Sequence, residues 1–412
     1  MRLDDHGGQA ADYISGTTVN TPAVAISNFC GSASTGAASY DCAINTLNAD
    51  RGTLTISFNH PVKNPIINLS GIGGYDWRWQ GGTANNPTFE NYMRLWTEFE
   101  LLTPNTTLEL LSTNGVFALD SSKKKLAPVD PTKVSSYCHW NPIWDAGCVA
   151  AQINGVGTSF TFSLDYNSIG GVSGQNGLTN RTTDDTFIVS VSVQDDYGSA
   201  PASYEPTVTS HTVSDLQIGA GVTADALTAL NATVDATGDA EATTSFKAFS
   251  TTPTFSEPGE TFKISFPVTA SAAAKVCGWV DWDLSGTFDT IERECVNVTA
   301  GTSTNKVLTW VIPAGVSTAS RWLRLRASYD TSGVEQPTGR LNSGEVEDYN
   351  ITFAASPAGG STEPPSEESN GALAETGDFS MFALFFVGLT LMVFSAAMFQ
   401  MRSMVRNSRR RH

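Results

Sequence analysis

Residues 281–292 (DWDLSGTFDTIE) carry oxygen-bearing side chains at the spacing of a calcium-binding loop. These oxygens occur at positions 1, 3, 5, 9 and 12 of the segment, and a glycine occupies position 6. Ca2+ prefers about six to eight oxygen ligands, and the glycine permits a turn tight enough for the backbone carbonyl at position 7 to join them. The predicted ligands are Asp281, Asp283, Ser285, Thr287, Asp289 and Glu292.

The segments that flank this loop, 277–280 and 295–298, have the composition of strands, so the loop is not expected to be an EF-hand. The alternative is a plain β-turn at 284–286 that joins two paired strands. Three acidic residues at 345, 347 and 348 are either further metal ligands or a solvated strand end. The sequence leaves these alternatives open.

The six cysteines fall into three pairs that are close in the sequence. No C-x-x-C motif is present and only His139 adjoins a cysteine, so neither zinc binding nor redox chemistry is indicated. Three local disulfides are expected, which require an oxidising compartment, and buried reduced thiols are the alternative. The expected pairs are Cys30 with Cys42, Cys138 with Cys148, and Cys277 with Cys295.

Aromatic residues are concentrated in two segments that precede residue 150. Trp77 and Trp79 lie in a glycine-rich stretch, 71–82, where we expect a loop, and rigid aromatic side chains in loops suit the binding of sugars or partner proteins. The alternative for each of these residues is a place in the hydrophobic core. The expected ligand-binding residues are Tyr75, Trp77, Trp79, Tyr137, His139, Trp140 and Trp144.

The chain of 412 residues has 24 Lys and Arg against 41 Asp and Glu, a formal net charge of −17. Nucleic-acid binders need clustered cations that displace counterions from phosphates, so we expect no nucleic-acid partner. The five histidines are scattered and no hydrolase, metalloprotease or P-loop motif is present, so we expect no enzymatic activity. A secreted glycan-active enzyme is a minor alternative, because the two carboxylates of a glycosidase need not be close in the sequence.

Short runs of β-branched and aromatic residues, bounded by Gly, Pro, Asn and Ser, recur along residues 20–354 and predict antiparallel strands. The expected fold class is all-β, with two tandem β-sandwiches. The tryptophans at 279, 282, 310 and 322 are expected in the core of the second sandwich. The predicted strands are 52–58, 65–70, 96–102, 159–164, 186–193, 261–268, 276–280, 306–312 and 322–327.

Both sandwiches resemble modules of bacterial surface proteins. Residues 196–204 (DYGSAPASY) and 344–349 (GEVEDY) are similar to the segment that usually precedes the GEVED domain and to the hexapeptide that closes it, with Ser199 in place of the usual Asp. In the first sandwich, 54–74 and 184–193 resemble the ligand-binding domain of CshA-type fibrillar adhesins. This second resemblance implies a lectin-like sandwich that binds a host matrix protein or glycan.

At the C-terminus a pentapeptide (LAETG), an uncharged apolar stretch at 379–399 and an arginine-rich tail follow one another. As a helix at about 1.5 Å per residue, the apolar stretch is long enough to span a bilayer. This order resembles the LPXTG-type sorting signal of Gram-positive cell-wall proteins, with alanine in place of the usual proline. The resemblance implies that a housekeeping sortase cleaves after the threonine and links it to peptidoglycan, and a protein held permanently by the helix is the alternative. The signal residues are Leu373, Ala374, Glu375, Thr376 and Gly377.

These segments predict a surface adhesin that passes through a single-span membrane precursor and ends covalently attached to the cell wall. A stalk or pilus-like protein without its own ligand is the alternative. Export requires a signal peptide, which the first residues lack, so we expect the start to be truncated or misassigned. The predicted parts are a disordered N-terminal remnant at 1–19, sandwiches at 20–194 and 195–354, a Pro/Ser/Gly linker at 355–372, the sorting signal at 373–377, a transmembrane helix at 378–401 and a basic cytoplasmic tail at 402–412.

Overall fold

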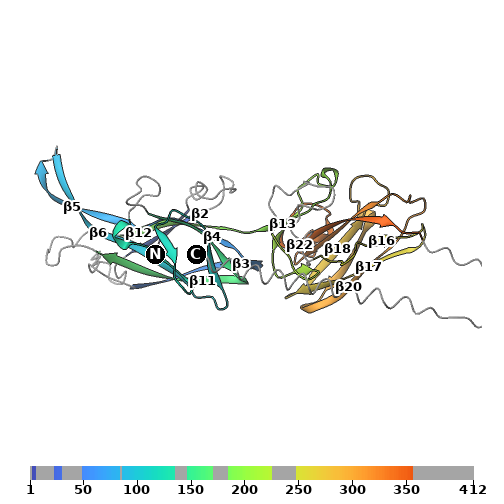
Figure 1. Ribbon diagram of the computed structural model, residues 1–412, viewed down its shortest axis with the longest axis horizontal. Coiled ribbons are helices and arrows are strands. Elements are labelled where there is room, and N and C mark those ends of the chain that lie inside the picture. Colours follow the sequence, from blue (N-terminus) through green and yellow to red (C-terminus); the bar gives the residue numbers. More distant parts are fainter. Residues whose placement is uncertain are drawn as a thin grey trace, which may run out of the picture. The chain divides into compact units, whose positions relative to one another are not determined.

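The computed structural model describes residues 2–5, 23–29, 49–83, 86–134, 146–169, 184–224 and 247–355. These residues form four β-sheets, joined by loops and single 3-10 turns (Figure 1). The prediction of an all-β chain is therefore confirmed. In this part of the chain no helix is long and apolar enough to cross a membrane.

Two six-stranded sheets form what we call the N-terminal sheet pair. The strand order is β1-β2-β12-β4-β10-β7 in one sheet and β3-β11-β6-β9-β8 in the other, where β5 also pairs with β6. The strands are β1 (Arg2–Asp5), β2 (Ala23–Phe29), β3 (Ala49–Lys63), β4 (Ile66–Ile72), β5 (Gly74–Thr83), β6 (Asn86–Leu101), β7 (Thr107–Thr113), β8 (Phe117–Leu119), β9 (Lys125–Pro128), β10 (Gly147–Asn154), β11 (Val156–Ile169) and β12 (Asp184–Ser192).

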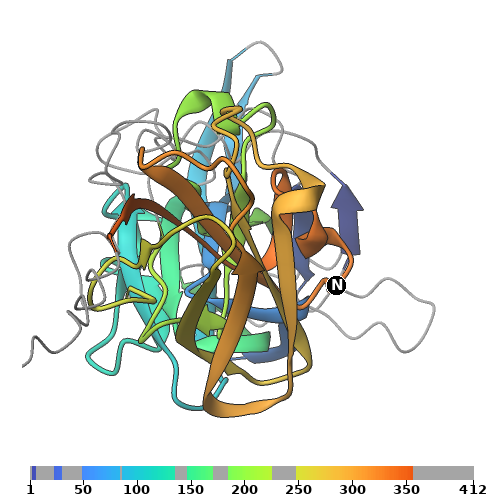
Figure 2. The ribbon, with the colours of Figure 1, turned by 90° about the vertical axis from the view of Figure 1, so that its right-hand side faces the viewer.

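A seven-stranded and a three-stranded sheet form the C-terminal sheet pair (Figure 2). The larger sheet has the order β13-β14-β22-β21-β18-β19, with β16 also paired to β22, and the smaller sheet has the order β15-β17-β20. The strands are β13 (Asp195–Tyr197), β14 (Ser210–Val213), β15 (Gln217–Ile218), β16 (Thr254–Phe255), β17 (Thr261–Ala270), β18 (Ala274–Val280), β19 (Arg293–Val298), β20 (Gly301–Val311), β21 (Arg321–Ser328) and β22 (Arg340–Phe353).

In β17, alternation of apolar and polar residues explains how the strand faces the core. In β17, Phe262 and Ile264 are buried whereas Thr261 and Lys263 are exposed, because successive side chains of a strand point to opposite faces. The buried residues join side chains of the larger sheet, such as Leu323, in one hydrophobic cluster. The four tryptophans predicted for the core of this sheet pair are all buried, which confirms that prediction. Trp282 and Trp310 lie in this cluster, and Trp279 and Trp322 lie in a second one.

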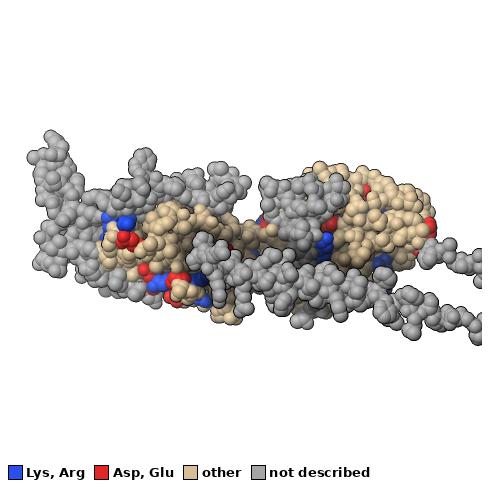
Figure 3. Space-filling model, in the orientation of Figure 1, with Lys and Arg blue, Asp and Glu red and all other residues tan. Residues whose placement is uncertain are grey.

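The N-terminal sheet pair has its own hydrophobic cluster, drawn from both of its sheets. Phe99 of β6 meets Phe187 of β12 edge to face, with ring centroids 5.0 Å apart, and the buried Trp96 belongs to the same cluster. Figure 3 shows blue and red side chains next to one another on one face. Lys125 of β9 and Glu98 of β6 form an ion pair at 2.6 Å. All nine predicted strand segments overlap observed strands, so their assignment is confirmed.

Candidate functional site

The predicted calcium loop connects β18 to β19. These strands pair antiparallel with Cys277 opposite Cys295, and the two cysteines form a disulfide. Both the paired strands and this disulfide are as predicted. Cys148 is disulfide-bonded as well, whereas Cys30, Cys42 and Cys138 lie outside the described residues.

Three carboxylates of this loop, which we call the acidic loop, converge on one point. Asp281, Asp283 and Glu292 each offer an oxygen atom, and these atoms all lie within 4.8 Å of one another. Asp281 and Glu292 are buried, whereas Asp283 is exposed to solvent. A hard cation could therefore reach the group through the exposed carboxylate and be held by the two buried ones.

Local donors fix the two buried carboxylates in place. Asp281 accepts hydrogen bonds from the Tyr204 hydroxyl at 2.5 Å and from the backbone amides of Ser285 and Gly286 at 3.0 and 3.1 Å. Glu292 accepts from the Trp282 amide at 2.6 Å and from a second amide, at residue 289, at 3.1 Å. A carboxylate has about four lone-pair positions, so these bonds leave acceptor capacity for an ion.

The electrostatics of the loop favour a bound cation. Burial raises the pKa of Glu292 to about 7, although two backbone amides oppose the shift, and the charges of Asp281 and Asp283 raise this pKa further. Burial and the bond to Asp281 also raise the pKa of the Tyr204 hydroxyl. Neighbouring carboxylates repel one another when ionised, and a divalent cation between them would remove that cost.

Of the other predicted ligands, Asp289 is the one that could have joined this group of carboxylates, whereas Ser285 and Thr287 carry no carboxylate. The Ser285 hydroxyl lies 3.2 Å from the backbone oxygen of Thr287 and 3.0 Å from its hydroxyl, so these two residues bind one another. Asp289 is exposed and lies outside the cluster of oxygens. Gly286 has a φ of 77°, which is the sharp turn expected at position 6, and Leu284, two residues earlier, also has a positive φ of 59°.

The sequence left two roles open for the acidic residues of β22, as further metal ligands or as a solvated strand end, and the structure fits neither. Glu345, Glu347 and Asp348 are buried, at most 5% exposed, so they are not a solvated strand end. Nor do they belong to the metal-type cluster of the acidic loop. Their oxygens accept hydrogen bonds from backbone amides of other segments, and these donors are Ile218 at 2.5 Å, Ala248 at 3.1 Å, and Ser199 and Ala200 at 2.8 Å each.

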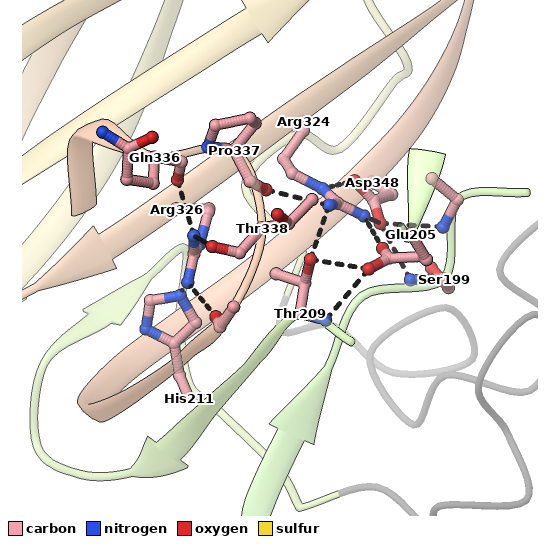
Figure 4. A network of polar contacts seen from close by, with 12 residues as sticks. Ser199, Glu205, Thr209, His211, Arg324, Arg326, Gln336, Pro337, Thr338 and Asp348 are labelled. Atoms are coloured by element: carbon pink, nitrogen blue, oxygen red, sulfur yellow. Dashed lines mark hydrogen bonds and ion pairs between the residues drawn. The ribbon is translucent and has the colours of Figure 1, made fainter. Parts of the chain in front are cut away.

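Arg324 of β21 completes the contacts of Asp348 (Figure 4). Its guanidinium forms two bonds of 2.8 Å to the two oxygens of Asp348 and a third contact to Glu205. The remaining donor reaches the Thr209 hydroxyl at 2.8 Å and the backbone oxygen of Pro337 at 3.0 Å. Arg324 is fully buried, and although burial by itself lowers its pKa, the two carboxylates raise the pKa above its ordinary value.

Arg326, two residues further along β21, is held mainly by neutral partners. It donates to the backbone oxygens of Gln336, Thr338 and Gly339 and to Nε2 of His211 at 2.9 Å (Figure 4). Nδ1 of His211 lies 2.9 Å from the Ser343 carbonyl, so the imidazole is neutral, donating through Nδ1 and accepting through Nε2. Burial first, and then the charge of Arg326, hold the pKa of His211 well below its ordinary value.

We call the contacts among Glu205, His211, Arg324, Arg326 and Asp348 the buried strand network. Two glycines, one from the block at 196–204 and one from the block at 344–349, permit it. A Cβ on Gly198 would lie 2.7 Å from an Arg324 nitrogen and 2.8 Å from a Glu205 oxygen. Gly344 has a φ of 105°, and a Cβ there would lie 1.8 Å from the backbone oxygen of Ala327. Asp196, from the same block as Gly198, accepts a bond from the Val346 amide at 2.6 Å. The blocks at 196–204 and 344–349 are therefore two halves of one structural unit.

The aromatic segment is a strand and not the expected loop. Tyr75, Trp77 and Trp79 lie in β5, which pairs with β6 so that Trp77 is opposite Asn91 and Trp79 opposite Phe89. The prediction of a loop failed because the glycines of this segment are tolerated inside a bulged strand, with register shifts after residues 76 and 79. Two other predictions fall outside the described residues. They are the second group of expected ligand-binding residues, Tyr137, His139, Trp140 and Trp144, and the sorting signal predicted within 356–412.

Residues 275–352 match the model of the GEVED domain. No curated protein matches the chain. The matched region begins within β18 and ends within β22, so it contains both the acidic loop and the closing hexapeptide, but not the segment at 196–204 that bonds to that hexapeptide. The C-terminal sheet pair therefore contains a GEVED domain.

Proposed function

We propose that the protein is a non-catalytic adhesin of a Gram-positive cell surface, attached to peptidoglycan through Thr376. In this proposal each sheet pair is an independent β-sandwich domain, followed by the linker, the sorting signal, one transmembrane helix and the basic tail. A housekeeping sortase would recognise 373–377 and release the residues that follow. The sequence order of pentapeptide, apolar stretch and arginine tail supports this part of the proposal.

The observation that carries the extracellular location is the disulfide between Cys277 and Cys295. It joins directly opposed residues of neighbouring strands, and a second cysteine pair includes Cys148 of the N-terminal sheet pair. Structural disulfides persist in secreted and surface proteins, whereas cytosolic thiols are kept reduced. A chain with bridges in both sheet pairs fits an oxidising exterior.

In this proposal the N-terminal sheet pair is the CshA-type ligand-binding domain and the hairpin of β5 and β6 is its contact region. The hairpin places Tyr75, Trp77 and Trp79 in a single strand at alternate positions. Aromatic residues supply a large contact area with few rotamers to immobilise, which suits recognition of a host matrix protein or glycan. The bridged segment at 137–148 would extend the same surface.

We also propose that the acidic loop binds Ca2+. The convergence of three carboxylate oxygens within 4.8 Å supports this, together with the charge repulsion that an ion would relieve. The proposed ligand set is Asp281, Asp283 and Glu292, completed by backbone oxygens or water, and the ion would stiffen the hairpin of β18 and β19.

Two experiments test the proposal separately. Incubation of the purified chain with a housekeeping sortase and a peptidoglycan-type amine should yield a product cleaved between Thr376 and Gly377, and a Thr376→Ala variant should yield none. Binding to an array of matrix proteins and glycans should be saturable and lost in the variant Trp77→Ala plus Trp79→Ala. The matched control is Thr55→Ala plus Thr161→Ala, an exposed pair on a neighbouring strand pair of the same sheet. Absence of binding across a broad array would contradict the adhesin assignment.

The second candidate is a stalk without its own ligand. The observation in its favour is that the carboxylates of the block at 344–349 accept hydrogen bonds inside the fold, as they would in a spacer module. A stalk predicts sortase attachment without saturable binding, so the two experiments together distinguish it from an adhesin.

A further inference from the structure

The last described strand, β22, is an interior strand of its sheet. On one side it pairs antiparallel with β21 over Glu345 to Ile351, and on the other side it pairs parallel with β14. Near its C-terminal end it also pairs parallel with β16, at Thr352 and Phe353. Strand β22 is therefore paired with three neighbouring strands.

The chain enters the same sheet pair close to the middle of β22. Asp196 bonds to the Val346 amide at 2.6 Å, and the next residues of this incoming segment bond to Asp348. Seven residues separate Val346 from Phe353, which at about 3.3 Å per residue is about 23 Å along the strand. Strand β13 is two positions away from β22, a lateral offset of about 10 Å. The line from entrance to exit therefore runs closer to the strand direction than to the direction across the sheet.

This placement decides how the sheet pair responds to tension between its two ends. A folded body under tension turns until the line between its attachment points lies along the force. Hydrogen bonds between antiparallel strands lie perpendicular to the strands, so a force along the strands strains all of them together. A force across the sheet instead opens the bonds one after another, which requires less force at each moment.

Tension would load the strands in a definite order. Strand β13 runs antiparallel to β14 and peels away first, after which the contacts of Asp348 and Glu205 hold the incoming segment. Strand β14 is then pulled towards its own N-terminus while β22 is pulled towards its C-terminus. Because the two strands are parallel, these opposite pulls slide them past each other and do not unzip them.

We propose that the C-terminal sheet pair is a tension-resistant module, built so that force between residues 195 and 353 shears β22 against β21, β14 and β16. The proposed biological use rests on the proposed function, in which the chain is tied to the wall at one end and bound to a ligand at the other. The mechanical property itself depends only on the strand arrangement. Forced unfolding is governed by the unfolding rate, so it is a property distinct from equilibrium stability.

The test compares two pulling directions in the same full chain by single-molecule force spectroscopy. Handles are attached through unnatural amino acids at residues 194 and 355 for the direction along β22. The control has handles at residues 194 and 294, because Glu294 of the edge strand β19 is level with Glu347 and the pull then runs across the sheet. Both forms have the same fold and equilibrium stability, which chemical denaturation would verify.

At a matched loading rate, the rupture force along β22 is expected to be at least about twice the force across the sheet. Equal forces, or a larger force across the sheet, would overturn the inference. The outcome is independent of sortase attachment and ligand binding, so a failure of the proposed function would leave the force ratio unchanged. Conversely, a ratio near one in a chain that is anchored and binds ligand would remove only the mechanical role.

Discussion

The acidic loop and the buried strand network use the same chemical groups for different ends. In both, carboxylates accept hydrogen bonds from backbone amides, and in both some carboxylates are buried. The strand network adds a guanidinium, since Arg324 is bonded to both Asp348 and Glu205. The donors to Asp281, Asp283 and Glu292 in the acidic loop come from one hydroxyl and from amides within the loop itself.

The partners of each carboxylate indicate whether it has a structural role or is available to bind an ion. In the strand network Arg324 forms ion pairs with both Glu205 and Asp348, and the donors come from segments far away in the sequence. The acidic loop brings three carboxylates together within 4.8 Å and leaves Asp283 open to water. An ion is therefore expected to bind the loop. Removal of any partner from the network is expected to lower the free energy of unfolding.

The largest effect is expected from Arg324→Met. This variant leaves Asp348 and Glu205 buried without their cation, which should lower the free energy of unfolding by about 3–5 kcal/mol. Chemical denaturation of the full chain would measure it. The matched control is Arg340→Met. Arg340 also donates two bonds to one carboxylate, that of Asp195, but the Arg340 side chain is 46% exposed. This pair should therefore contribute less than about 1 kcal/mol to the free energy of unfolding. Similar losses for both arginines would contradict the structural role of the network.

Gly344→Ala should cost about 3 kcal/mol, because the position has a positive φ and the added Cβ would collide with the Ala327 backbone. Gly315→Ala is the control, since its φ of 84° is also positive but nothing lies within 4 Å of the new atom. The control should lose about 1 kcal/mol through backbone strain alone. Equal losses, measured by denaturation, would show that the close approach of β21 and β22 does not matter.

The disulfide sharpens the comparison because it belongs to the hairpin that carries the acidic loop. Replacing Cys277 and Cys295 by serine should lower the free energy of unfolding by about 2–3 kcal/mol, since the bridge closes a short loop of the unfolded chain. The loop carboxylates are held by local amides, so Ca2+ affinity, measured by calorimetry, should change by no more than about twofold. Loss of Ca2+ binding in this variant would mean that the loop geometry depends on the bridge.

His211 provides a test of the network by pH. Its pKa is held well below the ordinary value, so the folded state stays neutral while the unfolded state gains a proton. The stability from this residue is complete above about pH 6.5 and falls by up to about 1.4 kcal/mol per pH unit below it. Unfolding of His211→Gln and of the parent chain should be compared between pH 7 and pH 5.5. The difference between them cancels the opposite contributions of Glu205 and Glu292, whose pKa values are raised. Parallel pH profiles would show that the imidazole is not held neutral.

The sequence predicted the parts of the fold that follow from local patterns. Alternation predicted strands such as 261–268, and the spacing of Cys277 and Cys295 predicted their pairing across a hairpin. The parallel neighbours of β22 could not be predicted in this way. Strand β14 has only four residues, all buried, and β16 has two, so neither shows an alternating pattern.

The candidate site was predicted only where its partners are close in the sequence. Asp281, Asp283 and Glu292 lie within twelve residues and were found by spacing. Arg324 and Glu205 are separated by 119 residues, and charged residues such as Asp348 suggest a solvated surface when they are considered alone. A signal was nevertheless present, since the blocks at 196–204 and 344–349 both resemble segments of the GEVED module. The glycines at 71–82 led to the prediction of a loop, which was wrong because a bulged strand accepts glycines.

The most direct test of the distinction between loop and network is the effect of Ca2+ on thermal unfolding in four forms of the full chain. With free Ca2+ tenfold above its dissociation constant, the parent chain should gain about 1.4 kcal/mol of stability. Asp348→Asn should be less stable but gain the same increment, and Thr209→Val serves as a milder change in the same network. Asp283→Asn should keep the stability of the parent chain without Ca2+ and gain nothing when Ca2+ is added. An increment that survives in Asp283→Asn, or that is absent from the parent chain, would contradict the account.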